Sequence, residues 1–428
     1  MTTARLDRYG RAVVRVRELA MAAGVALAVV VGAAGSTPGA GSAAAPRGAT
    51  QAGPTVTATP AARRTASAPT PTTAPTPTPT PTATATAEPT PTPTAAAPGP
   101  AAGPGPSAVR GDGAPDGTVK VVGDGTPASC TSQALATAVR SGGVISFSCG
   151  PAPVTIVVAE TLYTCNTTTC QHPWISGEPV TAMSLDGGGL VTLSGGGVRG
   201  IFYANACEEQ FGWLTSACQD DTRPHVTFRN LTFADGNAQG APAGFSGVGG
   251  GEGGGAIAMR AGTLTLSGVT FRNNQCMAAQ SDGGGGAVRV VGMRNAVTIS
   301  GSRFEGNRCA NGGAISSLQA PLVITDSQIT GNAATGHGAS DGNGGNGGGI
   351  YVDGTSQTVL VARTTISGNT APEGGPGIFF VSNDRTGTLT IDASTITGNT
   401  GQSFFTDPYR SIFYLGNGPI GVTGSTIE

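Results

Sequence analysis

The sequence predicts an all-β solenoid, a parallel β-helix with three short strands in each turn. An eleven-residue phrase recurs from residue 226, as VTFRNLTFADG, LTLSGVTFRNN, VTISGSRFEGN, LVITDSQITGN, VLVARTTISGN and LTIDASTITGN. A strand led by glycine precedes the later copies, as GGGAIAM, GGGAVRV, GGAISS, GGGIYV and GPGIFF. The phrases stay constant while the spacing between them varies, as expected when insertions fall in the loops of a solenoid.

Apolar alternation within the phrases assigns the strands and their inner faces. Leu264 and Leu266 are two residues apart and so point to one side of a strand, and the same holds for Val297 and Ile299. One apolar residue near the end of each phrase supplies the third strand. These residues are Phe271, Phe304, Ile329, Ile366 and Ile396. No single turn can bury its apolar side alone, so the turns are expected to stack about 4.8 Å apart.

Asparagine occupies the same place in five successive phrases. In stacked turns these amides would form a structural ladder, each bonding to backbone groups and to the amides above and below. The ladder residues are Asn274, Asn307, Asn332, Asn369 and Asn399. Cys276 and Cys309 each lie 12 residues after the first residue of their phrase. Stacking would bring these two cysteines within disulfide distance, so we predict that bond.

The cysteines also indicate an oxidising compartment. All eight follow residue 129, and an even number in a segment predicted to be exported predicts disulfides. Besides Cys276 and Cys309, the cysteines expected to form them are Cys130, Cys149, Cys165, Cys170, Cys207 and Cys218. The absence of a CxxC pair from the sequence argues against a zinc site built on thiolates.

The chain is expected to divide into four segments. Residues 1–45 combine five arginines with an apolar run at 19–35, which predicts a signal peptide or an uncleaved signal-anchor. Residues 46–115 are rich in proline, threonine and alanine and predict a disordered stalk. Residues 116–225 are expected to form the N-terminal cap and the first turns of the solenoid. A short helix from Thr131 to Val139 is our candidate cover for the open sheet edge.

The fourth segment, residues 226–428, holds the repeat turns. It stops at Glu428 just after a strand and before an asparagine corner, so we expect a partner or another copy to cap that end. The whole chain has 23 basic and 25 acidic residues, a net charge of -2. This balance argues against nucleic acid as a partner.

The repeats resemble those of a known family. The pairing of GGA[I/V] with [F/I]xxN, seen in GGGAIAM…FRNN, GGGAVRV…FEGN and GGAISS…ITGN, is similar to repeats of the chlamydial polymorphic outer-membrane proteins. More broadly, the pattern resembles the right-handed parallel β-helix of the pectate-lyase-like superfamily. The resemblance covers residues 226–428 and implies a right-handed coil in an exported, surface-associated protein that is used for adhesion.

Alternation along the glycine-led strands predicts a ligand groove on the outer face of the solenoid. It points one set of apolar residues inward and the neighbouring side chains outward. The inward residues are Ile257, Val288, Ile315, Ile350 and Ile378. An arginine beside aromatic and carboxylate side chains is typical of a sugar-binding groove. The candidate ligand-binding residues are Arg289, Tyr351, Asp353 and Phe379.

Four acidic residues precede glycine-rich strand starts in successive turns, which could bring them to one corner. They are Glu252, Asp282, Asp341 and Glu373. Clustered carboxylates are ligands that Ca²⁺ prefers, so these four are the candidate ligands if the protein holds a Ca²⁺ ion. The interpretation that we favour is that they are solvent-facing loop charges that keep the protein soluble, and we expect no cofactor.

Two catalytic alternatives and one surface alternative remain open. Residues 219–221 and 336–338 resemble motifs of polygalacturonase-type hydrolases. However, the acidic pair Asp220 and Asp221 lies over a hundred residues before His337, and no Arg-x-Lys segment follows that histidine. A Ca²⁺-dependent lyase would need clustered acids and an arginine acting on a uronate polymer. A partial threonine row resembles ice-binding solenoids, although Val323 and Val361 interrupt it. The row is Thr227, Thr265, Thr298 and Thr390.

From these observations we expect a non-catalytic, adhesin-like protein that is secreted or displayed on the cell surface. Its expected ligands are polysaccharides, cell-surface glycans or partner proteins. Residues 19–35 would serve as a membrane tether if the signal is not cleaved. A polysaccharide lyase or glycoside hydrolase acting on uronate polymers is the alternative function.

Overall fold

The computed structural model describes residues 4–6, 12–14, 119–164, 181–206, 220–240, 253–281, 283–338, 342–402 and 406–428. The chain divides into two units, Met1–Ala96 and Ala97–Glu428. In the described part of the first unit, β1 (Ala4–Leu6) and β2 (Ala12–Val14) pair in antiparallel fashion. The predicted apolar run at 19–35 and the predicted stalk at 46–115 lie outside the described residues, so both remain predictions.

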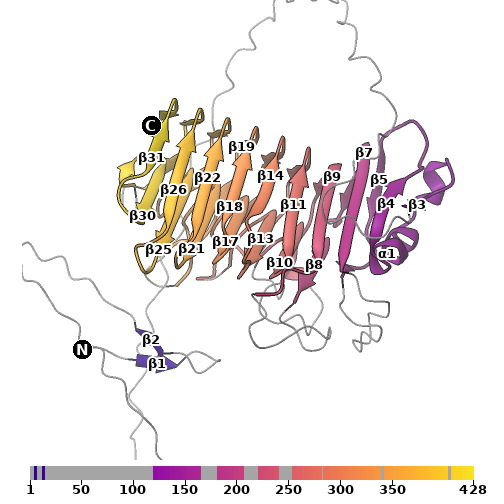
Figure 1. Ribbon diagram of the computed structural model, residues 1–428, viewed down its shortest axis with the longest axis horizontal. Helices are drawn as coiled ribbons and strands as arrows, with labels where there is room; N and C mark the ends of the chain where they lie inside the picture. The colour runs from indigo at the N-terminus through magenta and orange to yellow at the C-terminus, as the bar shows by residue number, and fades with distance from the viewer. Residues whose placement is uncertain are drawn as a thin grey trace, which may run out of the picture. The chain divides into compact units, whose positions relative to one another are not determined.

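The second unit is a solenoid whose strands stack rung upon rung in parallel (Figure 1). One of its sheets joins nine of the described strands, and only the pair β29–β30 in it is antiparallel. In spatial order these strands are β6 (Leu162–Tyr163), β8 (Phe202–Asn205), β10 (Ile257–Arg260), β13 (Val288–Val291), β17 (Ile315–Leu318), β21 (Ile350–Gly354), β25 (Ile378–Ser382), β30 (Ile412–Leu415) and β29 (Pro408–Tyr409). We call it the nine-stranded sheet.

A second sheet is bent along its length, and we call it the bent sheet. Two long strands, β7 (Ala182–Ser194) and β9 (His225–Ala234), run through the bend, whereas the turns on either side of them divide into two strands there. Its strands are β3 (Val119–Val122), β4 (Gly143–Phe147), β5 (Val154–Val157), β7 (Ala182–Ser194), β9 (His225–Ala234), β11 (Thr263–Ser267), β12 (Thr270–Arg272), β14 (Val297–Ser300), β15 (Arg303–Glu305), β18 (Leu322–Thr325), β19 (Gln328–Thr330), β22 (Thr358–Ala362), β23 (Thr365–Ser367), β26 (Thr388–Asp392), β27 (Thr395–Thr397), β31 (Gly421–Thr423) and β32 (Thr426–Ile427).

The three predicted strands of each turn are therefore present, and a fourth, shorter one follows them. It consists of two residues directly after each ladder asparagine, from Asn307 onward. These strands are β16 (Arg308–Cys309), β20 (Ala333–Ala334), β24 (Thr370–Ala371) and β28 (Thr400–Gly401), and they form their own parallel sheet. Two-residue strands leave no alternation to read, which is why the sequence did not reveal them.

The core is one column of apolar side chains along the solenoid. The rings of Phe233 and Phe271 stack at 5.3 Å between centroids, and those of Phe271 and Phe304 stack at 4.7 Å. Ile329 continues the same position in the next turn, paired with Phe304. All four side chains are fully buried. The strand register thus gives each turn the apolar partners that it lacks on its own, and the predicted fold class is confirmed.

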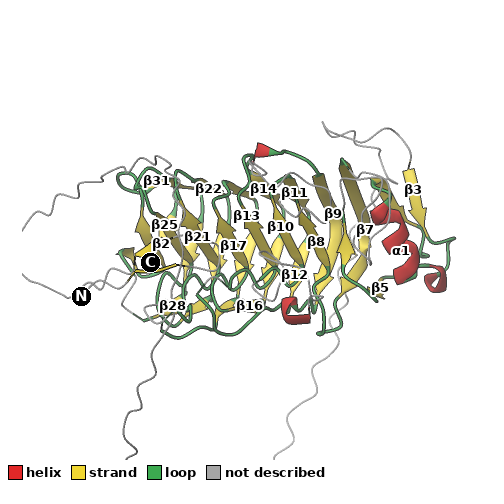
Figure 2. Cartoon of the chain, turned by 90° about the horizontal axis from the view of Figure 1, so that it is seen from below, coloured by secondary structure: helices red, strands yellow, loops and turns green. Residues whose placement is uncertain are grey.

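The N-terminal end of the solenoid carries the predicted helix. It forms α1 (Ser132–Arg140), preceded by the 3-10 turn Pro127–Ser129, and α1 covers this end of the solenoid (Figure 2). The side chain of Thr131 accepts a hydrogen bond from the Ala134 amide and caps the helix start, as expected for a helix N-cap. At the other end of α1, Lys120 donates to the carbonyls of Ser141 and Gly142, at 2.9 and 2.5 Å. Cations are favourable at this end because of the helix dipole.

The ladder of asparagines runs continuously from Asn274 to Asn399. The Asn332 Oδ1 accepts hydrogen bonds from the backbone amide and the Nδ2 of Asn307, at 3.0 and 2.9 Å. The Asn332 Nδ2 donates to the Oδ1 of Asn369 at 2.9 Å and to the Phe304 carbonyl at 3.0 Å. Each ladder side chain is buried to more than nine-tenths, so the amides satisfy backbone groups at a corner that water does not reach.

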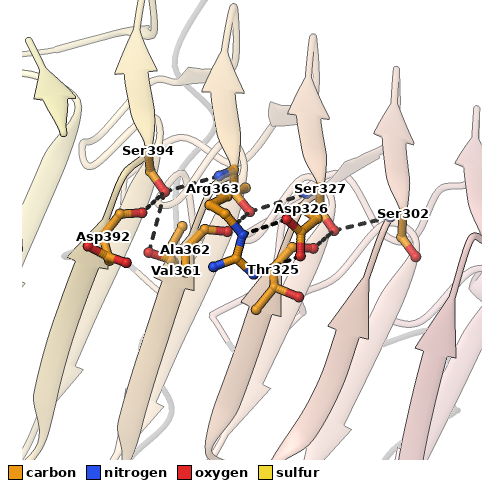
Figure 3. Close-up of polar contacts among 10 residues, drawn as sticks. Ser302, Thr325, Asp326, Ser327, Val361, Ala362, Arg363, Asp392 and Ser394 are labelled. Carbon is orange, nitrogen blue, oxygen red and sulfur yellow. Dashed lines mark hydrogen bonds and ion pairs between the residues drawn. The ribbon is translucent and has the colours of Figure 1, made fainter. Parts of the chain in front are cut away.

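Hydroxyl side chains form a second ladder, at the bend of the bent sheet (Figure 3). The Ser327 Oγ accepts the Ser302 amide at 3.1 Å and donates to the Thr325 carbonyl of its own turn at 2.7 Å. Other turns repeat this pattern. The hydroxyls are those of Ser302, Ser327, Thr364, Ser394 and Ser425.

Cross-links and surface rows complete the solenoid. Disulfides join Cys130 to Cys149 and Cys276 to Cys309, the latter pair with Cα atoms 4.8 Å apart. The other predicted disulfide cysteines lie outside the described residues; they are Cys165, Cys170, Cys207 and Cys218. In the outward threonine row of the bent sheet, Leu360 stands where we had expected Val361, which is fully buried.

Candidate functional site

The outer face of the nine-stranded sheet presents two rows of side chains that run along the solenoid axis. We call the first the aromatic row, because it ends in three rings: Tyr203, Ala258, Arg289, Ser316, Tyr351, Phe379 and Phe413. We call the second the aliphatic row: Asn205, Arg260, Val291, Leu318, Asp353, Val381 and Leu415. The strand register fixes both rows, and the predicted ligand residues fall on them.

Much of the aromatic row is covered, which corrects our expectation of an open groove. Arg289 is 2% exposed and Phe379 is 6% exposed, although both stand on the outward side of their strands. Ser316 between them is fully buried. Alternation gives the direction of a side chain from the strand, but the groups around it decide whether water reaches it, as the rings of Tyr351 and Phe413 do for Phe379. Tyr351 and Asp353 remain partly exposed.

The rings of the aromatic row stack on one another. Tyr351 and Phe379 lie 5.3 Å apart between centroids with planes 7° apart, and Phe379 and Phe413 lie 4.9 Å apart at 25°. Phe379 therefore has both of its ring faces covered, whereas Tyr351 and Phe413 are each covered by the stack on one face only. This arrangement differs from the exposed ring faces that we had expected beside Arg289.

Asp353 forms a polar group at the edge of this stack. Its Oδ2 accepts the Tyr351 hydroxyl at 3.2 Å, and its Oδ1 accepts the Asn383 Nδ2 at 2.9 Å. The adjacent Asp384 accepts hydrogen bonds from the hydroxyls of Ser382 and Ser356. These hydrogen bonds hold the pKa of the Asp384 carboxyl below its usual range. Asp384 therefore stays ionised and orders the turn between β25 and β26.

The aliphatic row is more open than the aromatic row. Val291, Leu318, Val381 and Leu415 are each partly exposed. Arg260 begins the open part of the row, and its Nε is buried without a hydrogen-bond partner among the described residues. None of the ion pairs found in the described ranges includes Arg260. The row therefore combines a cation without an ionic partner with a line of aliphatic side chains.

Of the predicted metal ligands, only Glu373 lies in the described part of the chain. Its Oε1 accepts the Gly338 amide at 2.6 Å. Glu252, Asp282 and Asp341 lie outside the described residues. In the described ranges, no three His, Cys, Asp or Glu side chains gather in a way that could hold a metal ion. The Ca²⁺ site therefore stays a prediction.

The residues that resembled a hydrolase motif lie in different turns. Asp221 pairs with Arg223 at 3.0 Å, and its carbonyl accepts the Gly262 amide beside β11. Asp220 faces the exposed Arg294 at 3.4 Å. His337 follows β20, at least two turns further along the solenoid. The structure does not bring these side chains into one constellation.

Arg260 and the aliphatic row were missed in the sequence. The sequence did contain the signal for the row. Asp353 was predicted to point outward two residues after Tyr351, and the same step of two residues in the other glycine-led strands gives the remaining members of the row. The isolation of Arg260 could not be found in this way, because a missing ion partner is a property of the folded surroundings. The hydroxyl ladder could have been predicted from the sequence, because serine or threonine recurs at the sixth place of the later eleven-residue phrases.

Parallel stacking of repeated turns around one apolar column defines a β-helix protein. The chain matches the family model "Right handed beta helix region" over residues 191–427, more than half of its length, and it belongs to this family. No curated protein and no solved structure matches the chain.

Proposed function

We propose that this protein is an exported, non-catalytic binding protein, secreted or held at the cell surface, which uses the outer face of the nine-stranded sheet. Its ligands are glycans or partner proteins, in the manner of an adhesin. The observation that carries the proposal is the aliphatic row, in which partly exposed apolar side chains recur over successive turns. Contiguous apolar surface on a folded protein commonly marks an interaction site.

Export is supported by features outside this face. The two disulfides of the described residues are stable in an oxidising compartment. The basic and apolar N-terminal segment has the pattern of a secretory signal. Within the described ranges, no helix has both the length and the apolar character needed to cross a membrane.

Binding can be tested on immobilised polysaccharides and extracellular proteins with the full exported chain. The variant Leu318→Asp places a charge in the aliphatic row, and Val323→Asp places the same charge on the outer face of the bent sheet. Both positions are partly exposed, so they form a matched pair. We expect Leu318→Asp to weaken capture at least tenfold on the ligands that bind, and Val323→Asp to leave it unchanged.

The same panel separates binding from catalysis. Soluble uronate polymers are incubated with the protein, with and without Ca²⁺, while absorbance reports unsaturated products and an assay for reducing ends reports hydrolysis. We expect neither product. Release of either product that is lost in Arg289→Gln would overturn the binding function in favour of a lyase or a hydrolase.

A further inference from the structure

The residues of the aliphatic row indicate the chemistry of the ligand that the row would bind, and this inference rests on the proposed function. From Arg260 to Leu415 the row includes one residue from each of six turns, which are separated by five spacings. Turns spaced about 4.8 Å apart make this distance about 24 Å, which corresponds to roughly seven residues of extended polypeptide. A ligand that contacts the whole row is therefore an extended chain.

Arg260 favours an anion at the N-terminal end of the row, because its partly exposed guanidinium has no ionic partner among the described residues. Its guanidinium is partly buried, its Nε is covered, and no described residue accepts a hydrogen bond from that nitrogen. The covered Nε is out of a ligand's reach, but the two terminal nitrogens of the guanidinium are not among its buried atoms, and a carboxylate can bind to them with two parallel hydrogen bonds. Its neighbours in the row are Asn205 and Val291, and neither can neutralise the charge.

The middle of the row favours apolar side chains over sugar rings. Sugars bind to exposed aromatic faces, but the central ring of the aromatic row, Phe379, is stacked between Tyr351 and Phe413 and is only 6% exposed. What the surface offers beside Arg260 is aliphatic, at Val291 and Leu318. Aliphatic side chains gain most from packing against other apolar side chains, as in the buried centre of protein interfaces.

We infer that the ligand is an extended segment of a partner protein, with a carboxylate bound to Arg260 and apolar side chains packed on Val291 and Leu318. The juxtaposition of this guanidinium, which has no ionic partner among the described residues, with a line of aliphatic residues carries this inference. Asp353 follows Leu318 in the row, and its negative charge disfavours a second carboxylate at that place in the ligand. The segment therefore has its acidic residue at one end.

The experiment uses a synthetic, fluorescently labelled octapeptide in which leucine alternates with serine and one end carries a glutamate. Its matched partner carries glutamine instead. Binding to the full chain is measured by fluorescence anisotropy. We expect the glutamate peptide to bind at least tenfold more tightly than the glutamine peptide, because the carboxylate alone satisfies Arg260. The preference should fall as salt is raised, because the attraction between the two charges is screened.

Variants of the chain locate the effect. Arg260→Gln should abolish the preference for glutamate, while Arg272→Gln should leave it intact, because Arg272 is an exposed arginine at the end of β12 in the bent sheet. Leu318→Asp should weaken both peptides. A glutamate preference that survives in Arg260→Gln would overturn the inference.

Two arms with polygalacturonate and a sulfated glycan test the competing ligand class. Binding of either glycan that depends on Arg260, with no binding of the peptides, would overturn the polypeptide ligand and leave the proposed function standing. If neither peptide nor glycan binds, and Leu318→Asp changes no capture in the wider panel, the proposed function itself fails.

Discussion

The two ladders of hydrogen bonds join the same turns but are built differently. In the asparagine ladder each amide bonds to the amides of both neighbouring turns, as Asn332 does with Asn307 and Asn369. In the hydroxyl ladder each side chain accepts one amide from the preceding turn and returns its proton to its own turn, as Ser327 does (Figure 3). The first is a continuous chain of side chains, and the second is a series of separate caps. Only the first should require one residue type throughout.

The largest effect is expected for Asn332→Ala. It removes the acceptor of two hydrogen bonds from Asn307 and leaves the Oδ1 of Asn369 without one of its donors, all at a buried corner. Unsatisfied buried polar groups cost about 1–3 kcal/mol each, so we expect a loss of about 3–5 kcal/mol. Chemical denaturation followed by circular dichroism measures it.

The control for that substitution is Asn295→Ala, which removes an exposed amide whose side chain makes one weak hydrogen bond among the described residues, 3.4 Å to the Thr263 hydroxyl. It should change the free energy of unfolding by less than about 0.5 kcal/mol. An equal effect of the two substitutions would show that the ladder contributes no more than a surface asparagine.

A smaller effect is expected for Ser327→Ala in the hydroxyl ladder. Only the Ser302 amide loses its acceptor, so the loss should be about 1–2 kcal/mol. Ser327→Thr should restore stability, because Thr364 already performs this role in the next turn. Failure of threonine to replace serine would contradict the description of this ladder as separate, interchangeable caps.

The smallest effect is expected for the ion pair at the same bend. Arg363 donates to both carboxylate oxygens of Asp326, at 2.6 and 2.8 Å, on the solvent side of the hydroxyl ladder. The hydrogen bond from Arg363 lowers the pKa of the Asp326 carboxyl. Its contribution is therefore complete above the ordinary Asp pKa of about 3.9 and is lost as the pH falls through the lowered value.

Both groups of this pair are solvent-exposed, so Arg363→Gln should leave the midpoint of denaturation at pH 7 almost unchanged. The variant should also lose less stability than the wild type when the pH is lowered from 4 to 2. Denaturation curves at three pH values test this. A marked destabilisation at pH 7 would show that the exposed pair, rather than the hydroxyls beneath it, stabilises the bend.

The sequence predicted the parts of the fold that follow from repetition. The asparagine at a fixed place in each phrase, the inward alternation from Ile257 to Ile378 and the helix after Thr131 all depend on local pattern and on stacking. Cys276 and Cys309 then fell into register and formed the predicted bond. Each of these features depends on residues close together in the chain or on a counterpart one turn away.

The candidate site was predicted less well, because exposure depends on loops that the repeat does not describe. Arg289 and Phe379 point outward as expected and are nevertheless covered. Arg260 has the same chemistry as Arg289, but only the folded surroundings show that its Nε lacks a partner. Repetition thus determines direction and register, whereas the irregular segments between the turns determine which outward side chains meet a ligand.

Lys120 is the only lysine in the chain, and it sits where β3 meets the end of α1. Apart from the amino group of the chain terminus, every amine-directed reagent has this one primary target. Coupling through it would attach all molecules to a support by the same end of the coil, with the outer face of the nine-stranded sheet left clear for measurement. Acylation would also remove the charge that binds the carbonyls of Ser141 and Gly142 just after α1, so labelling and loosening of the cap should occur together.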